Sequence, residues 1–294
     1  MRLHELGGSG LRVSRVGLGG NNFGRRLDVE GTRAVVDAAL DDGINFLDTA
    51  DIYGGGDSER FLGEILRGRR EQVVLATKFG MADDGSGSRD YVRRAITASL
   101  ERLATDHVDL YYYHRPDGVT PVAETIAALV ELVDEGTVRA IGVSNFSVEQ
   151  LDEAVQAGPV AALQNRYNLL ERDAEKDVVP RCAELGVAFI PYFPLASGLL
   201  TGKYRRGQPP PPGSRLEGRR EALSDEAFDR VERLDDFAAA RGRTLLELAI
   251  AGLASQAAVA SVIAGATTPE QVGENAAAAE WELGEDELGE LLSL

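Results

Sequence analysis

Short apolar runs alternate along the chain with segments in which apolar residues recur every three or four positions. The runs are rich in β-branched residues and contain few polar side chains, which is typical of strands buried on both faces of a parallel sheet. We predict eight strands, at residues 15–19, 44–48, 73–78, 108–114, 138–144, 160–165, 187–192 and 260–265.

The segments between these runs have the spacing of amphipathic helices. Ser147, with Gln150 three positions later, forms a capping-box pattern at one helix start, and Gly136, Gly158 and Gly186 follow helix ends. We predict helices at residues 29–41, 91–103, 122–133, 148–155 and 174–185.

Eight strands that alternate with helices in 294 residues predict a single α/β domain, a (β/α)8 or TIM barrel spanning residues 1–294. A doubly wound open sheet is the alternative. It is disfavoured because residues 17–22, Gly-Leu-Gly-Gly-Asn-Asn, lack the G-x-G-x-x-G spacing that follows the first strand of a dinucleotide-binding sheet.

Two segments depart from the alternation. The residues before Ser14 include Gly7-Gly8-Ser9-Gly10 and predict an N-terminal β-hairpin that closes the barrel floor. Residues 203–224, after the seventh strand, contain four consecutive prolines that a helix would not accommodate. Because this long loop lies on the face where barrel enzymes carry their active sites, we predict that it is a lid.

The formal net charge is −17, which disfavours nucleic acid and anionic membranes as partners. No apolar run approaches the ~20 residues of a membrane span, and residues 1–7 lack the apolar core of a secretory signal. One cysteine, Cys182, allows neither an intrachain disulfide nor a multi-cysteine zinc site, and Asp83-Asp84 is interpreted as a solvated loop. We therefore expect a soluble, cytoplasmic protein without a bound metal.

Polar residues follow the predicted strands directly, and in a barrel these strand ends meet at one mouth. Each has a structural explanation when taken singly: Asp48 as a helix cap, Lys78 as a stem that reaches solvent, His114 as the end of a strand. Their joint placement favours a functional site. The candidate site residues are Asp48, Tyr53, Lys78, His114, Ser144, Asn145, Gln164 and Tyr192.

Asp48, Tyr53, Lys78 and His114 together could transfer a proton. A lysine ammonium ~4 Å from a tyrosine hydroxyl is worth about 4 kcal/mol at an effective dielectric of 20, which lowers the tyrosine pKa by up to roughly three units. A carboxylate keeps the lysine charged, and a histidine orients a carbonyl oxygen or shares its proton. These groups supply no hydride, so a nicotinamide cofactor is implied.

Several motifs resemble the aldo-keto reductase family, in order and over nearly the whole chain. Residues 44–54 (INFLDTADIYG) resemble the signature around the catalytic Asp and Tyr, residues 76–79 (ATKF) the lysine motif and residues 109–116 (DLYYYHRP) the histidine motif. Residues 142–146 and 163–165 resemble the strands that hold the nicotinamide carboxamide. Residues 191–203 resemble the segment that meets the ring and the pyrophosphate, and residues 263–275 the adenosine site.

The resemblance implies a cytosolic, NADPH-dependent reductase of small aldehydes and ketones, as a monomer or weak homo-oligomer. Tyr53 is then the general acid, Lys78 and Asp48 tune it, and His114 orients the carbonyl. The implied cofactor contacts are Gly20, Asn21, Asp48, Ser144, Asn145, Gln164, Tyr192, Phe193, Pro194, Leu195, Ser197, Leu199, Lys203, Arg215, Gly265, Thr267, Gln271, Glu274 and Asn275.

Two features depart from many family members: Gly265 and Gln271 stand where Lys and Arg often meet the 2′-phosphate, and Phe193 stands where Ser is common. Gly265, Thr267 and Gln271 are similar instead to bacterial and potassium-channel β-subunit-like branches. NADPH is therefore expected to be favoured only modestly over NADH. A cofactor-sensing protein with little turnover is the alternative function.

Overall fold

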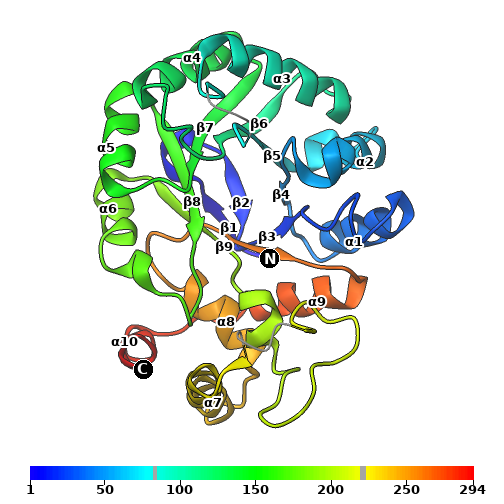
Figure 1. The fold of residues 1–294 in the computed structure, drawn as a ribbon, viewed down its shortest axis with the longest axis vertical. Coiled ribbons are helices and arrows are strands. Elements are labelled where there is room, and N and C mark those ends of the chain that lie inside the picture. Colours follow the sequence, from blue (N-terminus) through cyan, green and yellow to red (C-terminus); the bar gives the residue numbers. More distant parts are fainter. Residues whose placement is uncertain (82–84, 219–222) are drawn as a thin grey trace.

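The computed structural model describes residues 1–81, 85–218 and 223–294. Within these residues eight parallel strands close into a barrel in the order β10-β3-β4-β5-β6-β7-β8-β9, as predicted (Figure 1). The strands are β3 (Val16–Gly19), β4 (Phe46–Asp48), β5 (Val74–Phe79), β6 (Val108–Tyr113), β7 (Val138–Ser144), β8 (Val160–Arg166), β9 (Ala188–Tyr192) and β10 (Val262–Gly265).

Helices surround the barrel on its outside (Figure 1). They are α1 (Val29–Asp41), α2 (Asp57–Ile65), α3 (Arg89–Leu103), α4 (Val122–Asp134), α5 (Val148–Ala157), α6 (Val178–Leu185), α7 (Asp225–Ala239), α8 (Leu245–Ala254), α9 (Pro269–Ala278) and α10 (Glu285–Ser293). The helix expected at 174–185 begins only at Val178, because the Asp177 side chain accepts a hydrogen bond from the Val178 N–H there. None of the described helices is long and apolar enough to cross a membrane.

Apolar side chains pack in two layers. The inner layer fills the barrel and includes Phe46, Leu110, Tyr112 and Ile190. The outer layer lies between the strands and the helices and holds most of the buried aliphatic residues. Because both faces of every strand are covered, the strands carry the nearly continuous apolar runs from which they are predicted.

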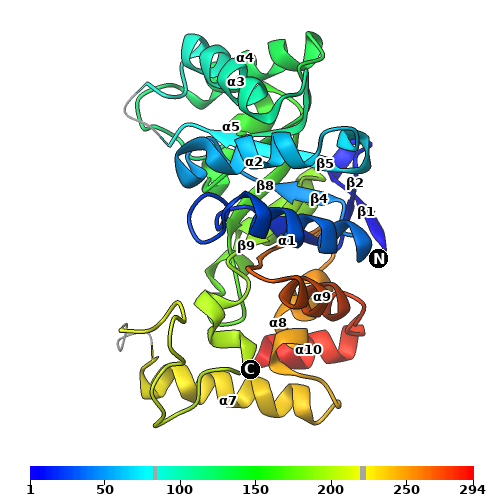
Figure 2. The same ribbon diagram turned by 90° about the vertical axis from the view of Figure 1, so that its right-hand side faces the viewer.

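The N-terminal hairpin consists of β1 (Leu3–Glu5) and β2 (Arg12–Ser14), which pair antiparallel as expected. Leu6 and Val13 are fully buried against the inner layer of the barrel. At the hairpin tip a Cβ on Gly7 would lie 2.4 Å from the Ala161 carbonyl oxygen, so only glycine allows this approach to β8. Figure 2 shows the hairpin on one side of the barrel and the long loop after β9 on the other.

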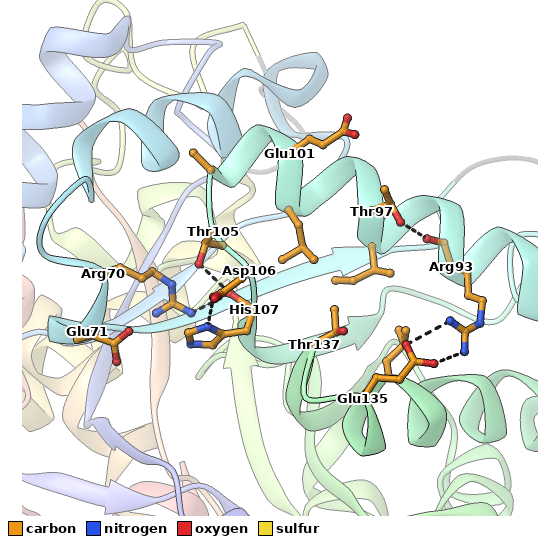
Figure 3. Close-up of a pocket in the computed structure, with 14 residues that line it drawn as sticks. Arg70, Glu71, Arg93, Thr97, Glu101, Thr105, Asp106, His107, Glu135 and Thr137 are labelled. Carbon is orange, nitrogen blue, oxygen red and sulfur yellow. Dashed lines mark hydrogen bonds and ion pairs between the residues drawn. The ribbon is translucent and has the colours of Figure 1, made fainter.

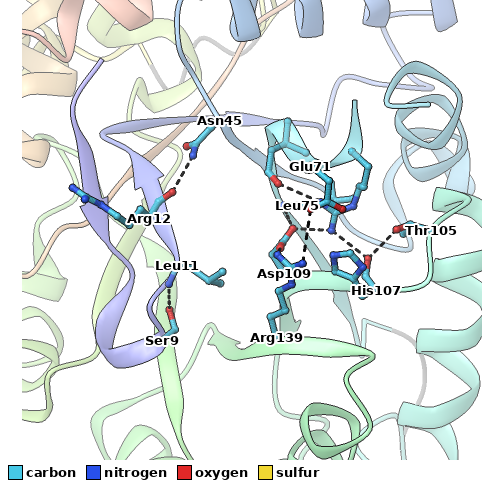
Figure 4. Close-up of polar contacts among 12 residues, drawn as sticks. Ser9, Leu11, Arg12, Asn45, Glu71, Leu75, Thr105, His107, Asp109 and Arg139 are labelled. Atoms are coloured by element: carbon cyan, nitrogen blue, oxygen red, sulfur yellow. Dashed lines mark hydrogen bonds and ion pairs between the residues drawn. The ribbon is translucent and has the colours of Figure 1, made fainter. Parts of the chain in front are cut away.

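Asp109 joins the strands at the barrel end that faces the hairpin (Figure 4). Its buried carboxylate accepts hydrogen bonds from the Leu75 N–H at 2.8 Å, from Arg70 at 2.7 Å and from Arg139 at 2.9 Å. A buried charge is tolerated only when it is paired in this way. Asp109 therefore stabilises the barrel, although it begins the histidine motif.

The long loop after β9 contains neither helix nor strand between residues 202 and 218. Tyr204 and Leu216 are buried inside it, and the Leu216 N–H donates to the Tyr204 hydroxyl at 3.2 Å. Residues 219–222 of the predicted 203–224 segment, like Asp83-Asp84, lie outside the described residues. The described part of the loop thus packs around its own apolar side chains.

Candidate active site

A cavity of about 860 Å³ opens at the carboxyl ends of the barrel strands. It brings together most of the residues selected from the sequence: Asn21, Asp48, Tyr53, His114, Ser144, Asn145, Gln164, Tyr192, Phe193, Pro194, Leu195, Ser197, Lys203, Arg215, Gly265, Thr267, Gln271, Glu274 and Asn275. Gly20, Leu199 and Lys78 do not line it. Gly20 packs against Ser58, Leu199 is buried, and Lys78 lies wholly beneath the surface.

Lys78 and Asp48 form a buried ion pair below the cavity floor. The Lys78 Nζ donates to Asp48 Oδ2 at 2.6 Å and to the Thr49 carbonyl at 2.8 Å. Burial lowers the pKa of Lys78, but the Asp48 carboxylate and Tyr53 outweigh burial, so the pKa is raised overall. Lys78 therefore stays charged, and its ammonium group is held by two groups at the end of the neighbouring strand β4.

Tyr53 lies just beyond β4, in a turn over Tyr53–Gly56. Gly54, Gly55 and Gly56 adopt positive φ angles of 59°, 68° and 95°, which side chains rarely tolerate, and this tight turn places the ring over the barrel mouth. The Lys78 Nζ lies 5.2 Å from the ring centroid, and the His114 ring meets it edge-on with centroids 6.1 Å apart.

The pKa of Tyr53 differs from the sequence-based expectation. Burial raises this pKa, and the opposing effect of Lys78 is smaller, so the net shift is upward. The expectation considered the lysine charge but not the desolvation of the phenolate, which is the larger effect here. Tyr53 is consequently a protonated phenol at neutral pH, the form that can donate a proton.

His114 ends β6 and is neutral at physiological pH. Burial, with the charges of Lys78 and Arg115, lowers its pKa to about 3. Its Nδ1 is buried and has no hydrogen-bond partner among the described residues. A neutral imidazole beside a tyrosine hydroxyl can donate or accept one hydrogen bond, which suits the orientation of a polar substrate atom.

A chain of amide and hydroxyl groups continues from the ion pair across β7, β8 and β9. Gln164 Nε2 donates to Asp48 Oδ1 at 3.0 Å, and Ser144 Oγ donates to the Gln164 carbonyl at 2.7 Å. Asn145 Nδ2 donates to Ser144 Oγ at 3.1 Å, while Asn145 Oδ1 accepts from the Tyr192 hydroxyl at 2.7 Å. Asn145 adopts a φ of 59°, a strained value of the kind that gathers at functional sites.

Helix α2 holds the strand ends from behind, a role that the sequence did not suggest. Glu59 is fully buried, accepts from Thr77 Oγ1 at 2.5 Å and pairs with Arg102 at 2.6 Å. Ser58 Oγ lies 2.7 Å from Thr49 Oγ1. Thr49 directly follows Asp48 in the sequence, and Thr77 directly precedes Lys78. These contacts therefore restrain both members of the ion pair.

The far end of the cavity is formed by the loops after β9 and β10. Phe193, Ala196 and Ser197 have positive φ values of 67°, 45° and 60°, and the Arg166 guanidinium lies 4.7 Å from the centre of the Phe193 ring. Thr267 donates to Gln271 Oε1 from its N–H at 2.8 Å. This end therefore holds neutral donors and acceptors at the start of α9.

The long loop reaches across this end of the cavity. Gly213, Ser214 and Arg215 line it, and Arg215 donates to Asn22 Oδ1 at 3.2 Å. This contact ties the described part of the loop to the cavity wall, and its function as a lid stays a prediction. The loop after β3 thus meets the loop after β9, although the two are about 190 residues apart in the chain.

Some lining residues lie within the sequence motifs or the predicted lid but were not selected singly: Arg115, Gly198, Thr201, Gly213, Ser214, Ile263 and Ala266. The sequence analysis missed Gly19, Asn22, Arg26, Met81 and Leu246. Asn22 and Met81 closely follow β3 and β5, which was the available signal, whereas Leu246 lies on α8 and offered none.

A second cavity of about 860 Å³ lies away from these residues, near the start of β6 and between α3 and α4 (Figure 3). Its polar groups already have partners: Arg93 pairs with Glu135, Arg70 pairs with Asp109 outside the cavity lining, and His107 Nδ1 lies 2.7 Å from Asp106 Oδ1. None of the residues that the sequence predicts for the site lines it. The candidate site is therefore the cavity at the carboxyl ends of the strands.

Comparisons with known proteins agree with this geometry. Residues 15–294 match the model of the aldo/keto reductase family. A probable voltage-gated potassium channel subunit beta of Oryza sativa subsp. japonica is 38% identical, over 94% of this chain and 90% of that protein. An NADH-specific methylglyoxal reductase of Escherichia coli is 35% identical, over 95% and 93%.

An aldo-keto reductase of Bacillus halodurans, solved in its holo form, superposes with a TM-score of 0.85 at 32% identity, over 100% of this chain and 96% of that one. Sequence similarity and superposition both extend over nearly the full length, barrel mouth included. The chain therefore belongs to the aldo/keto reductase family of oxidoreductases that act on carbonyl compounds with a nicotinamide cofactor.

Proposed function

We propose that this chain reduces a small aldehyde or ketone to an alcohol, with Tyr53 as the proton donor. The observation that carries the proposal is the convergence of Tyr53, His114 and the Lys78–Asp48 pair at one end of the cavity. In such a site the bound nicotinamide cofactor supplies a hydride to the carbonyl carbon.

The lining residues fit this cofactor in chemistry and in order along the cavity. Ser144, Asn145 and Gln164 offer amide and hydroxyl groups suited to a carboxamide, and Tyr192 offers an aromatic face. Asn145 would exchange its contact with the Tyr192 hydroxyl for one with the carboxamide. Lys203 and Arg215 provide cations for phosphate groups at the other end.

The protein residues have separate tasks in the proton transfer. His114, neutral because its pKa is about 3, orients the carbonyl oxygen towards Tyr53. The Tyr53 hydroxyl donates its proton to that oxygen as negative charge develops there. Lys78 stabilises the tyrosinate that remains, and Asp48 keeps Lys78 charged and in place.

Tyr53→Phe tests the proposal. With NADPH and a reactive aldehyde such as 4-nitrobenzaldehyde, we expect kcat to fall by about two to four orders of magnitude while the Kd of NADPH changes little. Tyr111→Phe is the matched control, because the buried Tyr111 hydroxyl has no partner among the described residues. Retention of more than about a tenth of the activity in Tyr53→Phe would show that another group donates the proton.

We further propose that NADPH is preferred over NADH by a modest margin. The segment 265–275 contains neither Lys nor Arg, so Thr267, Gln271 and the N–H groups at the start of α9 are the local donors for a 2′-phosphate. Arg215, held over the cavity by Asn22, adds a positive charge. Arg215→Ala should weaken NADPH by about tenfold or more and NADH less. Equal losses for the two cofactors in a fluorescence titration would remove Arg215 from the choice.

A cofactor-sensing role is the second candidate, favoured by the 38% identity to a protein named as a potassium channel β subunit. Retention of the complete set Asp48, Tyr53, Lys78 and His114 favours turnover instead. A panel of aldehydes and ketones, followed by the absorbance of NADPH, separates the two: tight cofactor binding without turnover of any carbonyl would support the sensor.

A further inference from the structure

Two arginines line the cavity without an ion-pair partner among the described residues: Arg26 and Arg115. Most other arginines of this acidic chain pair with carboxylates, as Arg93 does with Glu131 and Arg206 with Glu232. Arg26 and Arg115 are both exposed at the cavity. Two unpaired cations facing one cavity, in a chain of net charge −17, indicate a local attraction for anions.

Both arginines line the cavity from loops that follow barrel strands: Arg115 follows β6, and Arg26 lies in the loop after β3. Arg115 directly follows His114 and lies close enough to contribute to the lowering of its pKa. Arg26 lies on the loop after β3, which packs against the turn that carries Tyr53. The two segments approach closely: a Cβ added to Gly54 would lie 2.7 Å from the Phe23 carbonyl oxygen, and a Cβ added to Gly24 would lie 3.2 Å from the Gly54 Cα. Arg115 thus adjoins His114, and Arg26 lies two residues beyond Gly24, which packs against the turn that carries Tyr53.

The carboxylates at the cavity do not neutralise these two charges. Asp48 is already paired with Lys78, and Glu274 lies on α9, at the end of the cavity formed by the loops after β9 and β10. Lys203 and Arg215 come from the long loop and serve that same end. Arg115 therefore remains as positive charge beside His114, and Arg26 adds a second positive charge on the same cavity.

We propose that the carbonyl substrate carries an anionic group, a carboxylate or a phosphate, which Arg26 and Arg115 bind while the carbonyl faces Tyr53. This inference rests on the proposed function. A guanidinium group binds either anion in a bidentate manner. The substrate is small, because the same cavity of about 860 Å³ also has to hold the cofactor.

Pairs of carbonyl compounds that differ only in charge test the proposal. The carboxylate pair is succinic semialdehyde and its methyl ester, and the phosphate pair is glyceraldehyde 3-phosphate and glyceraldehyde. For at least one pair we expect the wild-type kcat/KM to favour the anion by about tenfold or more, and the preference to shrink in 0.5 M NaCl. The pair that shows the preference identifies the anionic group.

Arg26→Gln and Arg115→Gln should each lower the ratio of anionic to neutral kcat/KM by about tenfold. Arg25→Gln, on the same loop but not lining the cavity, should keep the wild-type ratio. A wild type that reduces both members equally, or variants that keep the wild-type ratio, would overturn the proposal. It would also be overturned if Arg26→Gln or Arg115→Gln chiefly raised the Kd of NADPH, because the arginine would then serve the cofactor.

A binding measurement separates this inference from the proposed function. By calorimetry, Tyr53→Phe protein saturated with NADP, in which turnover is suppressed, should bind 4-hydroxybutanoate more tightly than 1,4-butanediol, and addition of either arginine substitution should abolish the difference. Reduction of neutral aldehydes without any anion preference would refute the inference and leave the reductase function standing. Anion binding without turnover of any carbonyl would refute the reductase function and leave the anion site standing.

Discussion

Replacement of Asp48 by asparagine removes the charge that compensates Lys78 while it leaves the size of the side chain nearly unchanged. Lys78 is fully buried, and its Nζ is 2.6 Å from Asp48 Oδ2. At an effective dielectric of 20, opposite charges at that distance attract by about 6 kcal/mol, much of which offsets the cost of burying both. Without Asp48 the desolvated lysine charge has no counterion, so we expect the free energy of unfolding to fall by about 3–5 kcal/mol at pH 7.

The loss should depend on pH in a defined direction. In the wild type the pKa of Lys78 is raised, so its stabilising contribution is fully present below the ordinary lysine pKa and is lost as the pH rises through the folded value. In Asp48→Asn the main effect that raises the Lys78 pKa is gone, so we expect burial, the largest effect, to lower this pKa and the unpaired charge to disappear as the pH rises. The difference in unfolding free energy between the two proteins should therefore narrow from about pH 7 to about pH 10.

Equilibrium unfolding in urea measures this difference, with the fluorescence of the single tryptophan, Trp281, as the signal. Trp281 is buried, so unfolding changes its surroundings. Asp37→Asn is the matched control, because it breaks the ion pair between Asp37, whose side chain is 44% exposed, and Arg69, whose side chain is 26% exposed. It should lower the free energy of unfolding by less than about 1 kcal/mol. A loss in Asp48→Asn no larger than in Asp37→Asn would refute the argument that the Lys78 charge depends on Asp48.

Three further predictions concern the site and the barrel interior beneath it. Lys78→Arg should lower kcat by at least about a hundredfold, because the planar guanidinium does not fit the buried space between Asp48 and the Thr49 carbonyl; near-normal kcat would contradict this. The kcat/KM of reduction should show no histidine titration between pH 6.5 and 8, because the pKa of His114 is about 3. It should fall only above about pH 10, as Tyr53 loses its proton, whereas the kcat/KM of alcohol oxidation should rise there. Parallel pH profiles in the two directions would exclude Tyr53 as the proton donor. Gly142→Ala should destabilise the barrel by about 1–3 kcal/mol in urea, because its Cβ would lie 2.4 Å from the Tyr112 ring; unchanged stability would show that this ring moves freely.

Much of the fold follows from local patterns along the chain. The strand at residues 138–144 and the helix at 29–41 agree with the predictions residue for residue, because a buried parallel strand and an amphipathic helix each leave a periodic signal. The end of β3 is followed by residues of the cavity, as the rule for barrel strand ends predicts. Helices α2, α7, α8 and α10 were not predicted. Helices α2 and α10 have nine residues each, which provide too few turns for a distinct period, and α8 is buried along most of its length, so it lacks the polar face of an amphipathic helix.

The sequence by itself determined the barrel, the hairpin, the long loop and the set of polar residues at the strand ends, because the order of the strands decides which residues share the mouth. Only the tertiary structure decided the protonation of Tyr53, the role of Glu59 behind Lys78, and the placing of Arg26 and Arg115 on one cavity. The physical reason is that desolvation and charge interactions sum over groups from several elements. Their distances exist only once the barrel has closed, and no local spacing in the chain encodes them.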